Sequence, residues 1–494
     1  MKEYKQLAGQ TLIYGMGTIV PRFLNYFVLT PFYTRIFQDV QYGIVNEFYA
    51  YIVFLLILLT YGTETGYFRF AKEEKQKGRV FSTIMTSLFS TTLLFLLVVY
   101  FFNNQIASFL DYEDRSYLII LFASVVALDA FSAIPFAKLR FENKAKKFGL
   151  LKIFNVVANL FFNLLFFVIL PYIADNFPSA SILKIYNENI GVGYVFVSNL
   201  LASIFTLLLL MPELKIKFEF IQWSLLRKIL AYSLPLLFVG LSGAVNEVAD
   251  KFFLKILIPS KQEALSQIGI YSANYKLGML MTIFIQMFRY AAEPFYFSKM
   301  KDRDAKEIYA NVMKYFILFG LFIFLFVILY LDILKHFIGS DYHSGLKIVP
   351  IILVANLFLG IVYNLSIWYK LTNFTKYGAM IAFIGAGITV VFNLLLIPHY
   401  GYVGSAWTTL ICYVTMALIS YLLSRKYYPV PYDIRSFALY AFVVAGIFLL
   451  QNYIEYPGLV IKVLINSLFL LGFIGILIYK ERIRMSDVKA FFRR

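Results

Sequence analysis

Six charged side chains interrupt long apolar stretches of this 494-residue sequence. They are three cations and three carboxylates: Arg22, Lys251, Lys276, Asp129, Glu247 and Asp250. A charge near the centre of a membrane helix costs about 2.5–3.5 kcal/mol on insertion scales, so such residues are candidates for function. Cations at this depth could bind anionic groups, and Arg suits phosphate because it donates two parallel hydrogen bonds. Carboxylates at this depth could bind a coupling ion or neutralise the cations.

Two interpretations of the six charges remain open. In the structural one, they neutralise each other as three pairs: Glu247–Lys251, Asp250–Lys276 and Arg22–Asp129. The first pair has the i,i+4 spacing that places two side chains on one helix face. In the functional one, the three cations line a wet cavity and bind the substrate. The three carboxylates then bind a coupling H⁺ or Na⁺, or pair again with the cations after release.

The elements that carry these charges are apolar stretches of about 20 residues, and there are about fourteen of them. A bilayer core about 30 Å thick needs about 20 residues per helical crossing. Only helices and closed barrels satisfy their backbone hydrogen bonds there, and the length of these stretches favours helices. We therefore predict an all-α polytopic membrane protein with spans over 11–33, 43–63, 80–102, 116–137, 149–171, 190–210, 231–257, 268–291, 311–331, 346–369, 377–398, 402–424, 436–452 and 459–479.

The composition supports this fold class. Hydrophobic residues make up 61% of the chain, charged residues 15%, and the mean hydropathy is +0.74, which leaves no room for a large soluble domain. In a soluble protein a net charge of +17 would suggest nucleic acid as a partner. Here basic loops that face anionic headgroups explain it, so we expect no nucleic-acid partner. The single cysteine, Cys412, excludes an intramolecular disulfide.

Basic residues alternate between the loops. Segments 64–79 and 138–148 contain five Lys and Arg each and segment 480–494 contains six, whereas 399–401 and 453–458 contain none. Because cytoplasmic loops are enriched in Lys and Arg, we predict that both termini are cytoplasmic. The three histidines then lie in external loops, where we assign them no role and predict no metal site.

Two parts of the sequence resemble each other about 230 residues apart. KFGLLKIFNVVANLFFNLLFFVILP begins at Lys147, and KYGAMIAFIGAGITVVFNLLLIPHYGYVGSAWTTLI begins at Lys376. An offset of six spans gives the two halves the same orientation, which is typical of transporters built from parallel repeats. We predict two six-helix lobes around a central cavity, 1–217 and 218–430, with an interfacial linker helix at about 218–230. Residues 431–494 add two helices and a basic tail.

Four stretches carry a resemblance to a known family. They are PFYTRIFQDVQYGIVNEF from Pro31, KLRFENKAKKFG from Lys138, ADKFFLKILIPSKQEALSQIGIYSANYKLG from Ala249 and NLLLIPHYGYVGSAWTTLI from Asn393. In order and spacing the chain resembles the multidrug/oligosaccharidyl-lipid/polysaccharide exporter superfamily. Within it, the chain resembles the polysaccharide-export branch of O-antigen and capsule flippases.

The resemblance implies a function, a location and partners. A flippase of this branch moves a polyprenyl-pyrophosphate-linked oligosaccharide from the inner to the outer leaflet of the bacterial inner membrane by alternating access. We therefore expect lipid-linked oligosaccharide, membrane lipids, and the glycan polymerase and glycosyltransferases of the same pathway as partners. No cofactor is expected apart from a coupling H⁺ or Na⁺.

Two other functions remain as alternatives. A cation-coupled multidrug antiporter of the same superfamily would use an acidic residue in a lobe cavity, for which Asp129 is the candidate. The intramembrane cations argue against it, because they would repel a cationic drug. A membrane glycan polymerase would need catalytic residues on a sizeable external loop. The longest external loop, at about 172–189, is short, so we do not expect an enzyme.

Overall fold

The computed structural model describes residues 20–21, 23–72, 77–179, 181–214 and 222–481. In this part of the chain the regular structure is helical and contains no strand. Twelve helices there are long and apolar enough to cross a membrane, and a bent pair raises the number to 13. Residues 11–19 and 22 of the first predicted span, 11–33, lie outside the described residues. The prediction of an all-α membrane protein with about fourteen spans is confirmed.

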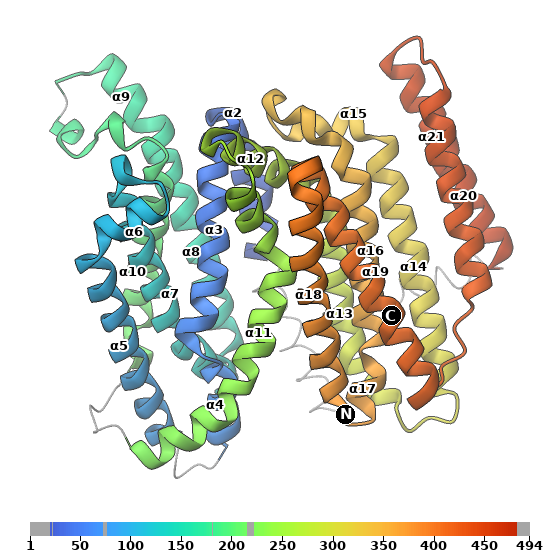
Figure 1. The fold of residues 1–494 in the computed structure, drawn as a ribbon, viewed down its shortest axis with the longest axis horizontal. Coiled ribbons are helices and arrows are strands. Elements are labelled where there is room, and N and C mark those ends of the chain that lie inside the picture. Colours follow the sequence, from blue (N-terminus) through green and yellow to red (C-terminus); the bar gives the residue numbers. More distant parts are fainter. Residues whose placement is uncertain (1–19, 22, 73–76, 180, 215–221, 482–494) are drawn as a thin grey trace. The chain divides into compact units, whose positions relative to one another are not determined.

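The chain divides into two compact units. Unit 1 comprises residues 1–272 and 382–408. Its helices are α2 (Thr30–Ile36), α3 (Asp39–Thr60), α4 (Thr63–Phe70), α5 (Lys77–Phe101), α6 (Asn103–Phe109), α7 (Tyr117–Phe141), α8 (Ala145–Leu164), α9 (Leu170–Asn176), α10 (Gly193–Leu214), α11 (Trp223–Leu257), most of α12 (Lys261–Leu277), most of α18 (Thr375–Tyr400) and the first turns of α19 (Tyr402–Tyr427). In Figure 1, α7 lies against α5 and α10, and α3 lies against α11.

Unit 2 comprises residues 273–381 and 409–494. Its helices are α13 (Met279–Lys299), α14 (Ala305–Leu329), α15 (Leu331–Leu334), α16 (Val349–Leu365), α17 (Ile367–Leu371), the first turns of α18 (Thr375–Tyr400), most of α19 (Tyr402–Tyr427), α20 (Ile434–Tyr453) and α21 (Leu459–Lys480). Helix α14 contacts α13, α16, α20 and α21 and forms the centre of this unit (Figure 1). The lobe boundaries inferred from the repeat, at 217 and 430, stay a prediction.

Two helix hairpins have turns of similar backbone conformation. Asn143 follows the last turn of α7 and precedes α8, and Asn373 follows α17 and precedes α18. Both adopt a left-handed conformation, with φ of 57° and 58°. Asn tolerates this region better than most residues, so it suits a tight turn between two helices. Asn143 lies four residues before Lys147 and Asn373 lies three residues before Lys376, so the two turns precede the two similar sequences at nearly the same place.

Two helices differ from the predicted spans. Helix α11 is continuous over 35 residues, so residues 223–230 are its first turns and not a separate linker helix; residues 218–221 lie outside the described part. The predicted span over 268–291 is broken at Gly278, between α12 and α13. A Cβ atom at Gly278 would lie 3.0 Å from Ile352 Cγ2, so the break occurs where the chain packs closely against α16.

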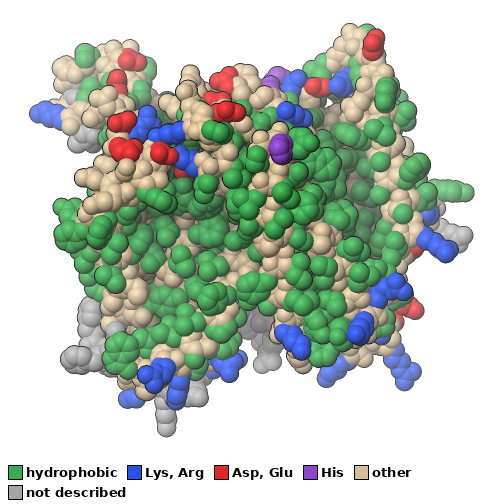
Figure 2. Space-filling view, viewed as in Figure 1, with side chains coloured by type: hydrophobic (Ala, Val, Ile, Leu, Met, Phe, Trp, Pro, Cys, Tyr) green, Lys and Arg blue, Asp and Glu red, His purple; other side chains and the backbone are tan. Residues whose placement is uncertain are grey.

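Charged side chains gather at the ends of the helices. Figure 2 shows hydrophobic side chains over the middle of the face in view. Acidic groups and histidines gather mainly toward one end, where some cations lie among them, and cations predominate at the other end. We call the end of each unit that carries the loops at 142–144, 300–304 and 372–374 the basic end. This band of apolar surface is the pattern expected of helices in a bilayer.

Candidate functional site

The predicted charges on α11 form one close pair. Lys251 Nζ lies 3.3 Å from Asp250 Oδ1, and the same oxygen accepts a hydrogen bond of 2.9 Å from the Lys251 backbone N–H. Only 16% of the Lys251 side chain and 8% of the Asp250 side chain are exposed. The ammonium also lies 5.7 Å from the centre of the Tyr271 ring. The structure therefore brings Asp250 and Lys251 together in a buried ion pair.

Of the other predicted pairs, Glu247–Lys251 does not form, and the other two stay predictions. Glu247 is exposed and forms no ion pair within the described residues, and Lys251 pairs with its neighbour Asp250 instead. The predicted Glu247–Lys251 pair is therefore wrong. Lys276 is half-buried on α12 and belongs to unit 2, whereas Asp250 belongs to unit 1. Asp129 on α7 accepts a hydrogen bond of 2.8 Å from Ser203 Oγ on α10.

The last predicted residue, Arg22, lies outside the described residues. Its pairing with Asp129 therefore stays a prediction, as do the substrate-binding and ion-coupling roles of all six charges. Among the five charged residues that the structure describes, Asp250 and Lys251 contact each other.

A second buried charge cluster was not predicted from the sequence. Glu47 on α3 is 1% exposed and accepts hydrogen bonds of 2.6 Å from the hydroxyls of Tyr51 and Tyr112, one on each carboxylate oxygen. Lys255 Nζ on α11 lies 3.7 Å from Glu47 Oε2 and 5.1 Å from the centre of the Tyr112 ring. Each carboxylate oxygen therefore accepts one hydrogen bond from a phenol, and the nearby Lys255 ammonium offsets the charge.

Close backbone contacts continue this cluster toward the end of unit 1 that is opposite the basic end. A Cβ atom at Gly43 would overlap the carbonyl oxygen of Leu265, and one at Gly269 would overlap that of Asp39. Ser266 Oγ donates a hydrogen bond to Asp39 Oδ2. Helices α3 and α12 therefore meet backbone to backbone, at positions where only glycine leaves enough space.

We call these contacts of α3 with α11 and α12 the polar seam. Its members are Asp39, Gly43, Glu47, Lys255, Ser266 and Gly269. It combines charged, hydroxyl and glycine residues inside spans that are otherwise apolar.

An apolar cavity adjoins the polar seam within unit 1. It has a volume of about 560 Å³ and is lined by aliphatic and aromatic side chains of α3, α5, α7 and α11, among them Tyr51, Phe122 and Phe252. Hydrocarbon suits such a lining, because a cavity without polar partners does not hold ordered water.

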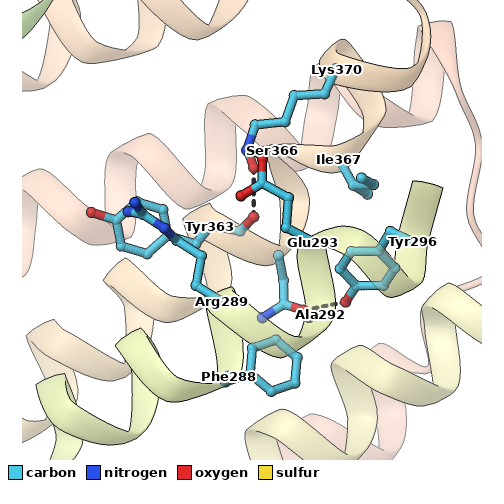
Figure 3. Close-up of a pocket in the computed structure, with 10 residues that line it drawn as sticks. Phe288, Arg289, Ala292, Glu293, Tyr296, Tyr363, Ser366, Ile367 and Lys370 are labelled. Atoms are coloured by element: carbon cyan, nitrogen blue, oxygen red, sulfur yellow. Dashed lines mark hydrogen bonds and ion pairs between the residues drawn. The ribbon is translucent and has the colours of Figure 1, made fainter. Parts of the chain in front are cut away.

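Unit 2 contains a polar pocket near its basic end, between α13, α16 and α17. Figure 3 shows Glu293 on α13 reaching toward Lys370 on α17, while the Arg289 side chain, also on α13, lies over the Tyr363 ring. Lys370 Nζ lies 2.7 Å from Glu293 Oε1. The Arg289 guanidinium lies 5.0 Å from the centre of the Tyr363 ring, and in the described part of the chain no carboxylate pairs with it. The pocket therefore contains two cations and one carboxylate.

Buried hydrogen bonds hold the floor of this pocket. The Tyr296 hydroxyl donates to Asn364 Oδ1 at 2.6 Å, and Asn364 Nδ2 donates to the Gly360 carbonyl at 3.1 Å. The Tyr309 hydroxyl donates to the Tyr296 carbonyl at 2.9 Å. Asn364 is only 3% exposed, so this network fixes α13 against α16 beneath the charged side chains.

One signal could have identified these residues from the sequence. Glu47, Lys255 and Arg289 all fall inside predicted spans, at 43–63, 231–257 and 268–291. The rule that singles out ionisable residues at membrane depth applies to each of them. Glu293 and Lys370 lie just beyond predicted spans, where a charge is ordinary, and only the fold brings them together. Among the described residues, no group of three or more His, Cys, Asp or Glu could hold a metal ion.

Comparison with known proteins agrees with this architecture. A family model described as "Polysaccharide biosynthesis protein" matches residues 7–301. No curated protein matches the sequence at a significant level.

Solved structures show the same fold at low sequence identity. A lipid II flippase, MurJ, in an inward closed conformation superposes with a TM-score of 0.73 at 16% identity, covering 96% of this chain and all of MurJ. An inward-facing multidrug resistance transporter of the MATE family gives 0.64 at 12% identity, covering 84% of this chain and 97% of the transporter. A MATE transporter in the straight conformation gives 0.53 at 15% identity, covering 85% of this chain and 95% of the transporter.

The family model covers more than half of the chain, and the fold agrees with the resemblance seen in the sequence. This protein therefore belongs to the polysaccharide biosynthesis protein family and to the multidrug/oligosaccharidyl-lipid/polysaccharide exporter superfamily.

Proposed function

We propose that this protein is a flippase for a polyprenyl-pyrophosphate-linked oligosaccharide, which it moves from the inner to the outer leaflet of a bacterial inner membrane. The observation that carries the proposal is the polar seam. Association of membrane helices gains little from the hydrophobic effect, and small residues with close packing suffice to hold them together. A permanently closed contact therefore has no need of a buried Glu47–Lys255 pair. A contact that opens to water does need such a pair, because charged groups are stable both when they are paired and when they are hydrated.

The substrate class agrees with the chemistry of the described residues. A lipid-linked oligosaccharide combines a hydrocarbon chain, anionic phosphates and a polar glycan. Bare phosphate in hydrocarbon is prohibitive, so its path must offer cations and hydroxyl groups. Lys251, Lys276 and Lys255 are cations within membrane-spanning helices, and the apolar cavity beside the polar seam suits a hydrocarbon chain. The family to which the chain belongs supports the same class.

The direction of transport follows from the proposed orientation. With the basic end in the cytoplasm, the polar seam lies on the external side. The substrate then enters while the polar seam is closed and leaves after α3 and α12 separate. A glycosyl-transfer reaction on the cytoplasmic face must supply this substrate, and a polymerisation or ligation on the outer face must consume it. No catalytic step is assigned to this chain, and a coupling H⁺ or Na⁺ remains part of the proposal.

Depletion of the protein from cells tests the proposal. The lipid-linked oligosaccharides would be extracted, and their exposure on each leaflet measured with a membrane-impermeant oxidant. We expect complete repeat units to accumulate on the cytoplasmic face while surface glycan is lost. An unchanged profile in a strain without a second flippase gene would contradict the proposal.

Dye efflux distinguishes the multidrug antiporter. That alternative requires the protein to export a cationic dye and requires Asp129 to be ionisable. The flippase requires neither, so an Asp129→Asn variant that abolished dye export while glycan display persisted would favour the antiporter.

A further inference from the structure

We propose that Arg289 and Lys370 form a phosphate-binding site near the basic end of unit 2. While no ligand is bound, the Glu293 carboxylate pairs with the Lys370 ammonium. This inference rests on the proposed function, because the ligand that we assign is the phosphate group of the lipid-linked substrate. The juxtaposition of two cations and one carboxylate in a pocket, seen in Figure 3, is the observation behind it.

The charges in the pocket do not balance. Lys370 and Glu293 neutralise each other at 2.7 Å, and Arg289 remains without a carboxylate in the described part of the chain. A purely structural ion pair would need one cation. The second cation leaves the pocket with a net positive charge, which favours an anionic ligand.

The geometry of Arg289 suits a phosphate. Its guanidinium lies 5.0 Å from the centre of the Tyr363 ring, close enough for a cation–π contact that restricts its movement. A guanidinium held by an aromatic ring keeps its edge N–H groups available, and these match phosphate oxygens in a two-bond contact. Lys370 adds a point charge from the opposite wall of the pocket.

Glu293 gives the site a way to release its ligand. A phosphate that binds Arg289 and Lys370 displaces the carboxylate from the ammonium, and Glu293 then turns toward solvent, to which 41% of its side chain is already exposed. When the phosphate leaves, Glu293 pairs with Lys370 again. Lys370 therefore always has an anionic partner, either the phosphate or Glu293, so binding and release are both fast.

The pocket is rigid enough to position these groups. Arg289 and Glu293 lie one helical turn apart on α13, so their side chains share one face. The buried Tyr296–Asn364 bond holds that helix against α16. At Gly360, a Cβ atom would overlap the ring of Phe316 on α14, so α16 and α14 also meet closely.

A binding assay tests the site without transport. The purified full-length protein in detergent and phosphate-free buffer would be titrated with farnesyl diphosphate. We expect Arg289→Gln and Lys370→Gln each to weaken binding about tenfold or more, since a hydrogen bond to a charged group contributes about 1.5–3 kcal/mol. Glu293→Gln removes the carboxylate that competes with the ligand for Lys370. We therefore expect this variant to bind farnesyl diphosphate at least as tightly as the wild type does.

Two controls match the charge removed. Lys301→Gln and Arg303→Gln each remove one exposed cation from the loop after α13, outside the pocket, and we expect wild-type affinity for both. Arg289→Lys keeps the charge but loses the two-bond contact, so we expect intermediate affinity. This variant also keeps the test valid if Arg289→Gln does not fold.

Two further probes identify the source of the phosphate. Inorganic pyrophosphate should displace farnesyl diphosphate, whereas vesicles of phosphatidylglycerol at the same phosphate concentration should not. Equal displacement by the vesicles would assign the pocket to bulk phospholipid and would overturn the inference. Wild-type affinity in both Arg289→Gln and Lys370→Gln would overturn it as well.

Failure of this inference is distinguishable from failure of the proposed function. If depletion leaves the lipid-linked oligosaccharides unchanged, the flippase proposal falls whatever the pocket binds. If depletion blocks export but the pocket variants bind farnesyl diphosphate normally and restore export, only the phosphate site falls.

Discussion

At the residue scale, the polar seam depends on how completely Glu47 is satisfied. Tyr51, Tyr112 and Lys255 contact its two oxygens, and only 1% of the Glu47 side chain is exposed. Removing one member of a buried ion pair leaves the other charge without compensation, which is more costly than removing both. If α3 and α11 separate, water must therefore reach both the Glu47 carboxylate and the Lys255 ammonium.

We expect Glu47→Gln to destabilise the protein strongly, by about 3–5 kcal/mol, because it leaves the Lys255 ammonium buried and uncompensated. Lys255→Met in the same chain removes that charge, so the double variant should regain much of the loss. Thermal unfolding of the purified protein in detergent measures both effects. Glu188→Gln, on an exposed turn of unit 1, is the matched control. A double variant no more stable than Glu47→Gln would contradict the pairing.

Sequence alone identifies some of these residues but not their partners. Asp250 and Lys251 stand out because charges are rare in apolar spans, and the structure joins them. Helix periodicity suggested Glu247 as the partner of Lys251. In the structure Glu247 is exposed, and the buried Asp250, next to Lys251 in the sequence, is the partner. Glu293 and Lys370 are 77 residues apart, so their contact depends on tertiary packing that no local pattern encodes.

At the element scale, the contact of α3 with α12 depends on two glycines. A methyl group at Gly43 would overlap the backbone of α12, and a backbone cannot move aside as a side chain does. The same substitution at Gly243 on α11 meets nothing within 4 Å.

We expect Gly43→Ala to weaken the closed seam, whereas Gly243→Ala should be neutral or stabilise α11 by up to about 1 kcal/mol. In a Cys412→Ala background, the rate at which a membrane-impermeant thiol reagent labels a cysteine in place of Ser266 measures opening. The rate should rise in Gly43→Ala only. Equal labelling in the two glycine variants would show that close packing at Gly43 does not hold the helices together.

Helix α21 is attached to α14 and α15 near both of its ends. Lys462 Nζ lies 2.5 Å from Asp332 Oδ2, and Lys314 Nζ lies 2.5 Å from Glu481 Oε2. Asn466 Nδ2 also donates to the Leu329 carbonyl at 2.6 Å. The two C-terminal helices are therefore held to unit 2 by specific polar contacts as well as by apolar packing.

Acid should loosen this attachment. Hydrogen bonds from Lys462 and then from Lys335 hold the pKa of Asp332 below its usual value. A carboxyl with a lowered pKa stabilises the fold above its usual pKa, and this contribution is lost as the pH falls through the lowered value. We expect the melting temperature of the wild type to fall more than that of Asp332→Asn between pH 5 and pH 3. Parallel pH profiles for the two proteins would contradict a role for this pair.

The elements themselves are the part that sequence predicts well. All fourteen predicted spans overlap described helices, because runs of about 20 apolar residues leave few alternatives in a bilayer. The break at Gly278 was missed, since it depends on the approach of Ile352 from α16. The length of α11 was missed as well, because its basic first turns look interfacial in a hydropathy pattern.

At the scale of the whole molecule, the family membership is shown, and the internal repeat stays a prediction. The turns at Asn143 and Asn373 share a left-handed conformation just before the two similar sequences, and the family model matches residues 7–301. The central claim is that a lipid-linked oligosaccharide crosses the membrane each time the polar seam opens and closes. That claim ties the buried charges, the glycine contact and the substrate class into one cycle.

The most direct test is transport by purified protein in liposomes. The substrate would be the lipid-linked oligosaccharide extracted from depleted cells, with its exposure measured by impermeant periodate. One variant would carry Asp39→Cys and Ser266→Cys in a Cys412→Ala background, so that a short thiol cross-linker locks α3 to α12. We predict transport by the wild type and by the uncross-linked variant, and none after cross-linking. Undiminished transport by the cross-linked variant, or wild-type transport no faster than in protein-free liposomes, would contradict the account.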